Sequence, residues 1–287
     1  MSQGSKAVLI TGCSTGIGRE TARHLAGIGG FAVYATAREV DSIADLERDG
    51  CRTLALDVTD EASMKNAVEA VEEAEGSVWG LVNNAGYSQS GAVESIPLDS
   101  LRRQFETNVF GLVRMCQLVL PGMRRAGAGR IINLSSMGGK LTFPGGGAYH
   151  ATKYAVEALS DAMRFEVKGF GVDVVLMEPG LITTSFGDTA VGSIDDTSAE
   201  GAGAGPYDAF NAELAKSTAD AYSGPMAKLG GGPETVASKI ETALTSTRPR
   251  PRYTVTASAK ILMTQRRLMT DRGWDRVMGT QFSRPGR

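Results

Sequence analysis

The hydrophobic residues of this chain fall into two patterns that alternate along its length. Short, nearly continuous apolar runs, such as 6–11 and 31–36, are typical of strands buried on both faces of a parallel sheet. Elsewhere the apolar positions recur every three or four residues, as they do from Ala148 to Phe165, which predicts helices with one buried face. The alternation of the two patterns indicates an α/β domain built on a doubly wound parallel sheet.

The remaining apolar segments complete this pattern. They predict further strands at 53–56, 78–82, 131–134, 172–177 and 252–256. They predict helices at about 19–26, 61–73, 97–120, 148–168 and 234–244. We therefore expect a single Rossmann-type domain over residues 1–287. Its seven strands should lie in the order 3-2-1-4-5-6-7, with the functional site at their carboxyl ends.

Composition narrows the class of protein. The chain has 287 residues, 42% hydrophobic and 22% charged, as expected of a globular protein with an ample core. No stretch resembles a signal peptide or approaches the ~20 apolar residues of a membrane span, which predicts a cytoplasmic protein. The scattered Cys13, Cys51 and Cys116 suit a reducing compartment and give no disulfide framework. With only two histidines in the chain, we expect no metal site.

A glycine-rich turn joins the first strand to the first helix. Gly12, Gly16 and Gly18 allow the backbone to turn sharply and to pass close to a pyrophosphate, which would rest on the helix N-terminus. A connection of this kind can also be a turn and nothing more. Its setting inside one strand–helix–strand unit, 7–36, favours nucleotide binding.

Three polar residues around the fifth predicted strand form a candidate catalytic set. Tyr149 and Lys153 are four residues apart near the start of a helix, so their side chains share one face. An ammonium group near a phenol favours the phenolate and lowers its pKa from about 10. Tyr149 could then exchange a proton with a substrate oxygen held by Ser136, which follows strand 131–134. Taken alone, Tyr-x-x-x-Lys is more often an ordinary pair on a helix surface.

These motifs occur together and in a recognisable order. Thr11 precedes the Gly-x-x-x-Gly-x-Gly turn, Asn83-Asn84-Ala85-Gly86 follows the fourth strand, and the serine, tyrosine and lysine come after it. From Lys6 to about Phe186 the chain resembles the short-chain dehydrogenase/reductase family. The resemblance implies hydride transfer between a nicotinamide cofactor and an alcohol or carbonyl. It also implies that Tyr149 moves the proton, Lys153 lowers its pKa and holds the nicotinamide ribose, and Ser136 positions the oxygen.

The resemblance assigns further residues. Asn108 would bend its helix and hold a water that completes a proton relay, although a hydrogen-bonded interior amide is the alternative. Asp57 would bond the adenine amino group, although an aspartate there also suits a turn or a helix N-cap. The residues implied to contact the cofactor are Gly12, Ser14, Thr15, Gly16, Ile17, Gly18, Arg38, Asp57, Val58, Asn84, Ala85, Gly86, Tyr149, Lys153, Pro179, Gly180, Ile182 and Thr184.

The end of the second strand bears on the choice between NAD and NADP. An NAD site usually has an acidic residue there, against the ribose hydroxyls. This chain has Arg38 and no acid until Glu39. Because a guanidinium can bind the 2′-phosphate with its planar fork, the sequence favours NADP, with Thr15 as a further hydroxyl contact. The alternative is that Arg38 is a solvated surface charge.

Two segments depart from the pattern. Residues 185–233 are rich in Gly, Ala, Ser, Thr and Asp, and we expect them to be irregular, either as a substrate lid or as a disordered segment. Residues 245–287 carry ten Lys or Arg and two Asp, a net charge of +8. Since these cations are spread out, they favour a solvated rim or an oligomer contact over nucleic-acid binding.

We therefore expect an NADP(H)-dependent oxidoreductase that interconverts a small-molecule ketone or aldehyde and an alcohol, as a homodimer or homotetramer. The glycine turn together with 34–38 is most similar to the hydroxysteroid and retinol dehydrogenase branch, which favours an apolar, lipid-like substrate. Three alternatives stay open: a non-catalytic NADP-binding regulator, a dehydratase or epimerase with a retained nicotinamide, and a protein that binds anionic surfaces through its basic C-terminal segment.

Overall fold

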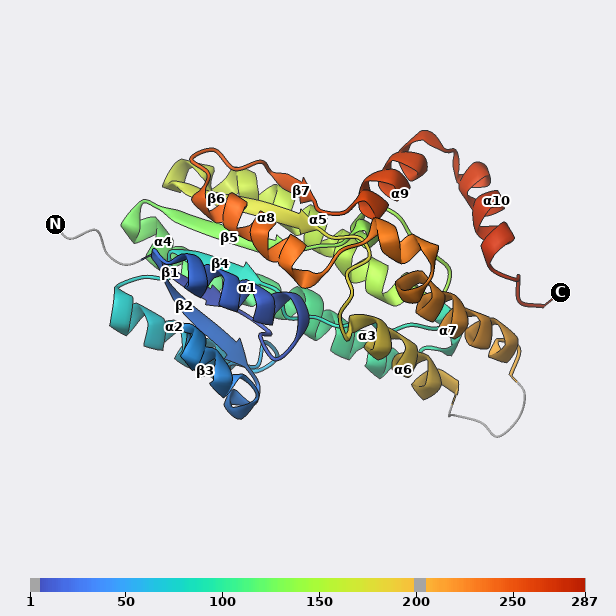
Figure 1. The fold of residues 1–287 in the computed structure, drawn as a ribbon, viewed down its shortest axis with the longest axis horizontal. Helices are drawn as coiled ribbons and strands as arrows, with labels where there is room; N and C mark the ends of the chain where they lie inside the picture. The colour runs from blue at the N-terminus through green and yellow to red at the C-terminus, as the bar shows by residue number, and fades with distance from the viewer. Residues whose placement is uncertain (1–5, 199–204, 287) are drawn as a thin grey trace.

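A seven-stranded parallel sheet forms the centre of the molecule (Figure 1). The computed structural model describes residues 6–198 and 205–286. The strands are β1 (Lys6–Ile10), β2 (Phe31–Ala37), β3 (Arg52–Ala55), β4 (Gly80–Asn83), β5 (Gly129–Leu134), β6 (Val172–Glu178) and β7 (Arg252–Thr254). Their order is β3-β2-β1-β4-β5-β6-β7, and every neighbouring pair is parallel. The predicted fold and strand order are confirmed.

Helices cover both faces of the sheet. They are α1 (Gly16–Ile28), α2 (Glu61–Glu75), α3 (Leu98–Phe105), α4 (Leu112–Ala126), α5 (Gly147–Val167), α6 (Phe186–Ser198), α7 (Asp208–Ser223), α8 (Pro233–Thr245), α9 (Ala257–Leu268) and α10 (Asp271–Gln281). Adjacent strand residues enter opposite layers: Leu9 packs in one core with α2, α4 and α5, whereas Ile10 packs in the other with α1 and α8. This two-sided burial is why the strands read as nearly continuous apolar runs. No helix among the described residues has both the length and the apolarity to cross a membrane.

Three helix boundaries differ from the prediction in ways that affect the site. Helix α1 begins at Gly16, so the last glycines of the turn form its first turn. The long helical stretch is divided by a π-helical turn, Glu106–Gly111, which carries Asn108 between α3 and α4. Helix α5 ends at Val167, one residue before the predicted end, and a short 3-10 turn closed by Gly171, which has a φ of 78°, follows it. A π turn inside a helix is rare and often lies at a functional site.

The expectation that 185–233 is irregular is wrong over most of its described length. Helices α6 and α7 lie side by side beyond the carboxyl end of the sheet (Figure 1). Ile194 on α6 packs with Phe210 and Leu214 on α7 and with Ala92 in a small core of their own. The small and polar composition hid the four-residue apolar spacing within α7. Part of the predicted irregular stretch, 199–204, lies outside the described residues.

Candidate active site

A cavity of about 760 Å³ opens at the carboxyl ends of the central strands. Its wall is shared by the glycine turn, the loops after β4, β5 and β6, the first turns of α5, and helices α6 and α7. The predicted site residues that line it are Gly12, Ser14, Thr15, Gly16, Ile17, Asn84, Gly86, Ser136, Tyr149, Lys153, Pro179, Gly180, Ile182 and Thr184. Segments from both halves of the sequence therefore meet at one place.

Hydrogen bonds lock the glycine turn to the loop after β4. The Thr11 hydroxyl accepts from the backbone N–H groups of Asn84 and Ala85, each at 3.0 Å. The Asn84 Nδ2 donates in return to the carbonyls of Thr11 and Gly12, each at 2.9 Å. A Cβ at Gly18 would lie 2.4 Å from that Nδ2 atom and from the Gly12 oxygen, so only glycine fits there. The two loops form a rigid joint between β1 and β4.

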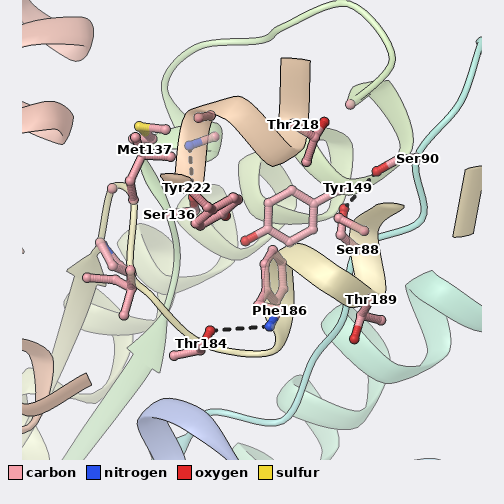
Figure 2. Close-up of a pocket in the computed structure, with 18 of the residues that line it drawn as sticks. Ser88, Ser90, Ser136, Met137, Tyr149, Thr184, Phe186, Thr189, Thr218 and Tyr222 are labelled. Atoms are coloured by element: carbon pink, nitrogen blue, oxygen red, sulfur yellow. Dashed lines mark hydrogen bonds between the residues drawn. The ribbon is translucent and has the colours of Figure 1, made fainter. Parts of the chain in front are cut away.

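The candidate catalytic residues lie on two neighbouring elements, the turn after β5 and helix α5. Ser136 follows β5, and its Oγ accepts from the Gly138 N–H at 3.0 Å. Tyr149 and Lys153 are on the first turns of α5, and Figure 2 shows Tyr149 beside Ser136. The Lys153 Nζ donates to the Leu134 carbonyl at 2.7 Å and lies 5.7 Å from the centroid of the Tyr149 ring. Serine, phenol and ammonium groups thus converge on one pocket.

Comparison with known proteins agrees with this geometry. The family model described as short chain dehydrogenase matches residues 6–192. The chain belongs to the short-chain dehydrogenase family. The uncharacterized oxidoreductase YbbO of Escherichia coli K12 is 34% identical over 274 residues, which is 95% of this chain and 94% of YbbO.

Solved structures agree with the same assignment. A short-chain dehydrogenase from Streptomyces avermitilis matches this one with a TM-score of 0.77 and 33% identity, over 97% of this chain and 95% of that one. The closed form of a serine dehydrogenase complexed with NADP⁺ matches with a TM-score of 0.74 and 26% identity, over 87% of this chain and 94% of that one.

The protonation state of this short-chain dehydrogenase differs from the prediction. Burial raises the pKa of the Tyr149 phenol above its usual range, and hydrogen bonding to Ser136 lowers it by less. Burial also lowers the pKa of Lys153 to about 8. The predicted lowering of the Tyr149 pKa by Lys153 is therefore wrong here, because desolvation is the larger effect and the ammonium bonds a backbone carbonyl. At neutral pH Tyr149 is a protonated phenol.

Asn108 is a fully bonded amide beneath the cavity wall. Its Oδ1 accepts from the Tyr87 N–H at 3.1 Å, and its Nδ2 donates to the Tyr87 carbonyl at 2.9 Å and to the Thr152 hydroxyl at 3.1 Å. The side chain thereby links the loop after β4 to α5, next to Lys153. The hydrogen-bonded interior amide is what the structure shows, and the water-holding role stays a prediction.

The residues predicted to contact the adenine end lie outside the cavity lining. Arg38 directly follows β2, is exposed, and has no hydrogen bond or ion pair within the described chain. The Asp57 Oδ1 accepts from both the N–H and the hydroxyl of Thr59, at 2.9 and 2.8 Å, so the turn interpretation holds. Asp60 is the N-cap of α2 and accepts from Ala62 and Ser63. The Val58 carbonyl faces Gly111, where a Cβ would lie 2.3 Å from its oxygen.

Sequence reasoning missed an ion-pair cluster behind the catalytic residues. Arg252 of β7 lies 3.0 Å from Glu157, 2.5 Å from Asp161 and 3.3 Å from Glu178. Lys140, which follows the Ser136 turn, pairs with Glu157 at 2.8 Å. Glu157 comes one helical turn after Lys153, and Glu178 directly precedes Pro179. The cluster therefore joins all three segments that carry the site.

The same cluster corrects the interpretation of the basic C-terminal segment. That segment was expected to form a solvated rim or an oligomer contact. For Arg252 this is wrong, since its guanidinium bonds carboxylates of which Glu157 and Glu178 are almost completely buried. Pairs between groups so far apart in sequence leave no local pattern from which they could have been predicted.

Proposed function

We propose that this protein is an NADP(H)-dependent oxidoreductase that interconverts a ketone or aldehyde and an alcohol. One observation carries the proposal: Ser136, Tyr149 and Lys153 line the same cavity as the glycine turn. A cofactor bound along that turn would bring its reactive end to the three side chains. The apolar character of the lid residues that complete the wall supports a lipid-like substrate, steroid- or retinoid-like in class.

The glycine turn fits a dinucleotide. Gly12 has a φ of 73° and Gly16 a φ of 59°, conformations that glycine adopts without strain. The turn leads directly into the N-terminus of α1, where backbone N–H groups favour a phosphate. When bound, the nicotinamide would supply or accept the hydride. Pro179, Gly180, Ile182 and Thr184 would surround it, and Lys153 would hold its ribose.

The protein's own groups supply the proton and orient the substrate. Tyr149, protonated at neutral pH, donates its phenolic hydrogen to the carbonyl oxygen during reduction. Because the Ser136 oxygen already accepts from the Gly138 N–H, its hydroxyl hydrogen is available to bond the same substrate oxygen. Because burial raises its pKa, Tyr149 carries the proton that reduction requires.

Two further features belong to the proposal. Helices α6 and α7, with the connection after them, act as the substrate lid, because residues of both helices form part of the cavity wall. The protein forms a homodimer or homotetramer, supported by the apolar Phe165 and Leu159, which are exposed on α5. Light scattering of the purified protein measures this directly, and a monomer at micromolar concentration would contradict it.

A substrate screen with one variant tests the proposed reaction. NADPH oxidation is measured over a panel of apolar ketones and aldehydes, for the wild type and for Tyr149→Phe. We expect kcat of the variant to fall by about 10²–10⁴-fold, as for loss of a general acid. Tyr154→Phe, on the exposed side of the same helix, is the control. Undiminished turnover in Tyr149→Phe would refute the assigned role.

Arg38 tests the choice of cofactor. A charge-assisted hydrogen bond of about 1.5–3 kcal/mol to the 2′-phosphate predicts that Arg38→Ala weakens NADPH binding roughly 10–100-fold. NADH binding should change little, because NADH lacks that phosphate. Fluorescence titration of both cofactors gives the two dissociation constants. Arg48→Ala, another exposed arginine, is the control, and equal losses for NADPH and NADH would exclude the role of Arg38.

A further inference from the structure

The part of the cavity beyond Tyr149 has walls of two kinds. Apolar groups come from the lid and from the C-terminal helices, and they include Phe186, Leu214, Met226, Leu262 and Phe282. Neutral hydroxyl groups occupy much of the rest: Ser88, Ser90, Thr189, Ser217, Thr218 and Tyr222. Figure 2 shows several of these hydroxyls around the Tyr149 ring. Such a wall can bind alkyl chains and uncharged polar groups.

Charged groups are nearly absent from this wall. Of the cavity-lining residues that the structure describes, Lys153 and Asp220 are the ones with an ordinarily charged side chain. Lys153 bonds the Leu134 carbonyl, on the cofactor side of Tyr149. His150 also lines the cavity, but burial lowers its pKa to about 4, so its imidazole is neutral at pH 7. No cation among these residues faces the substrate end.

The lid has a net negative charge, which does not favour an anionic substrate. Residues 185–233 contain seven acids (Asp188, Asp195, Asp196, Glu200, Asp208, Glu213 and Asp220) and two lysines (Lys216 and Lys228), a net charge of −5. Neither lysine lines the cavity. A carboxylate or phosphate entering the site would lose its hydration and find no cationic partner among the cavity-lining residues at the substrate end.

Asp220 gives the wall a single carboxylate. It is exposed on α7, two residues before Tyr222, and its side chain has no ion pair within the described residues. A protonated amine at the far end of a substrate could pair with it. Because exposed pairs are weak, the gain would be a few-fold rather than a requirement for binding.

We propose that this site takes amphiphilic carbonyl compounds whose remote end is uncharged or a protonated amine, and that it rejects those bearing a carboxylate or phosphate. The inference rests on the proposed carbonyl–alcohol reaction and defines its substrate class.

One matched series of substrates tests the inference by turnover. Three methyl ketones of the same chain length, about ten carbons, end in a methyl, an ammonium or a carboxylate group. With NADPH at low salt, we expect kcat/KM for the carboxylate to be at least about tenfold below that for the methyl-ended ketone, as for a charge without a partner. The ammonium-ended ketone should match or exceed the methyl-ended one. A carboxylate that reacts as fast as the other two would overturn the inference.

A charge reversal at Asp220 tests whether the lid causes the charge selectivity. Asp220→Lys should raise kcat/KM for the carboxylate-ended ketone several-fold and lower it for the ammonium-ended one. Glu166→Lys makes the same charge change on α5, at an exposed position outside the cavity lining. It should leave kcat/KM unchanged for both the carboxylate-ended and the ammonium-ended ketone. If both variants change these kcat/KM values equally, the overall charge of the protein rather than the lid governs selectivity, and the inference fails.

Calorimetry separates this inference from the proposed reaction. Decanol, decylamine and decanoate are titrated into the NADPH-saturated protein, which requires no turnover. Decanoate should bind at least about tenfold more weakly than decanol. If decanoate binds more weakly than decanol but no ketone is turned over, the proposed reaction is contradicted and the charge selectivity is supported. Turnover with equal binding of decanoate and decanol would contradict the selectivity alone.

Discussion

Different interactions stabilise the two sides of the cavity. On the side of α5, ion pairs and backbone hydrogen bonds fix almost every group: Lys153 bonds a strand carbonyl, and Arg252 joins three carboxylates. On the side of α6 and α7, a four-residue apolar cluster and a few bonds to the loop after β4 hold the lid. The proposed chemical step needs fixed groups and the proposed lid has to admit a ligand, which agrees with the interactions found on each side.

Removing the centre of the ion-pair cluster should have the largest effect on stability. Arg252→Met leaves Glu178 buried without its cation and leaves Glu157 with Lys140 alone, which predicts a loss of about 3 kcal/mol in the free energy of unfolding. Urea denaturation measures it. Arg102→Met removes a surface pair with Asp99, in which both side chains are mostly exposed, and should cost less than about 1 kcal/mol. Similar losses in the two variants would show that the cluster is no more important than a surface pair.

The buried imidazole beside Tyr149 gives the α5 side a pH dependence. The pKa of His150 is about 4 in the folded protein, against about 6.5 in an unfolded chain. Since the pKa of His150 is lower in the folded protein than in the unfolded chain, the contribution of His150 to stability is complete above about pH 6.5. This contribution is lost as the pH falls towards 4. The contribution is about 3 kcal/mol, at 1.36 kcal/mol per pH unit.

A substitution isolates that contribution from the other acid-sensitive groups. His150→Gln keeps an acceptor for the Phe143 N–H, which bonds the His150 Nδ1 at 3.3 Å. Between pH 7 and pH 4 the wild type should lose about 3 kcal/mol more of its unfolding free energy than the variant. Denaturation at both pH values gives the difference. Parallel losses in the two proteins would mean that the pKa of His150 is the same in the folded and the unfolded protein.

The lid should respond to truncation in a different way from the core. Leu214→Ala removes apolar contacts from the small cluster, and we expect KM to rise several-fold with kcat within about twofold, because substrate contacts are lost and the acid is not moved. The unfolding free energy should fall by about 2 kcal/mol or less, at the low end for a buried leucine. Leu25→Ala, in the α1 core, should cost about 2–5 kcal/mol and leave KM unchanged. If Leu214→Ala lowers stability as much as Leu25→Ala, the lid is part of the main core.

The difference between the two sides of the cavity also explains which parts of the structure could be predicted from the sequence. The strands, their order and the residues that meet at the cavity follow from local patterns, since apolar runs and the glycine spacing are short-range signals. Asn108 was expected either to hold a water or to be a bonded interior amide, and the structure shows the bonded amide. By contrast, α6 and α7 were missed because a composition rich in small and polar residues conceals a four-residue apolar period.

Two other errors have a common physical cause. The Tyr149 pKa was predicted from its neighbour along the helix, yet burial determines its direction, and an electrostatic interaction with Tyr222, which is distant in sequence, raises it further. Arg252 was assigned to the surface, although its partners lie more than seventy residues away. Burial and long-range pairing depend on the assembled fold, so no local pattern encodes them. The family model ends at residue 192, so the lid beyond that residue also lies outside the shared pattern.

The joint between Thr11 and Asn84 has a consequence for how molecules reach the site. It crosses the point where the winding of the sheet reverses, and four hydrogen bonds would have to break before β1 and β4 could separate there. Because these bonds hold that wall in place, we expect a ligand to enter past the proposed lid, where α7 packs through a few apolar side chains.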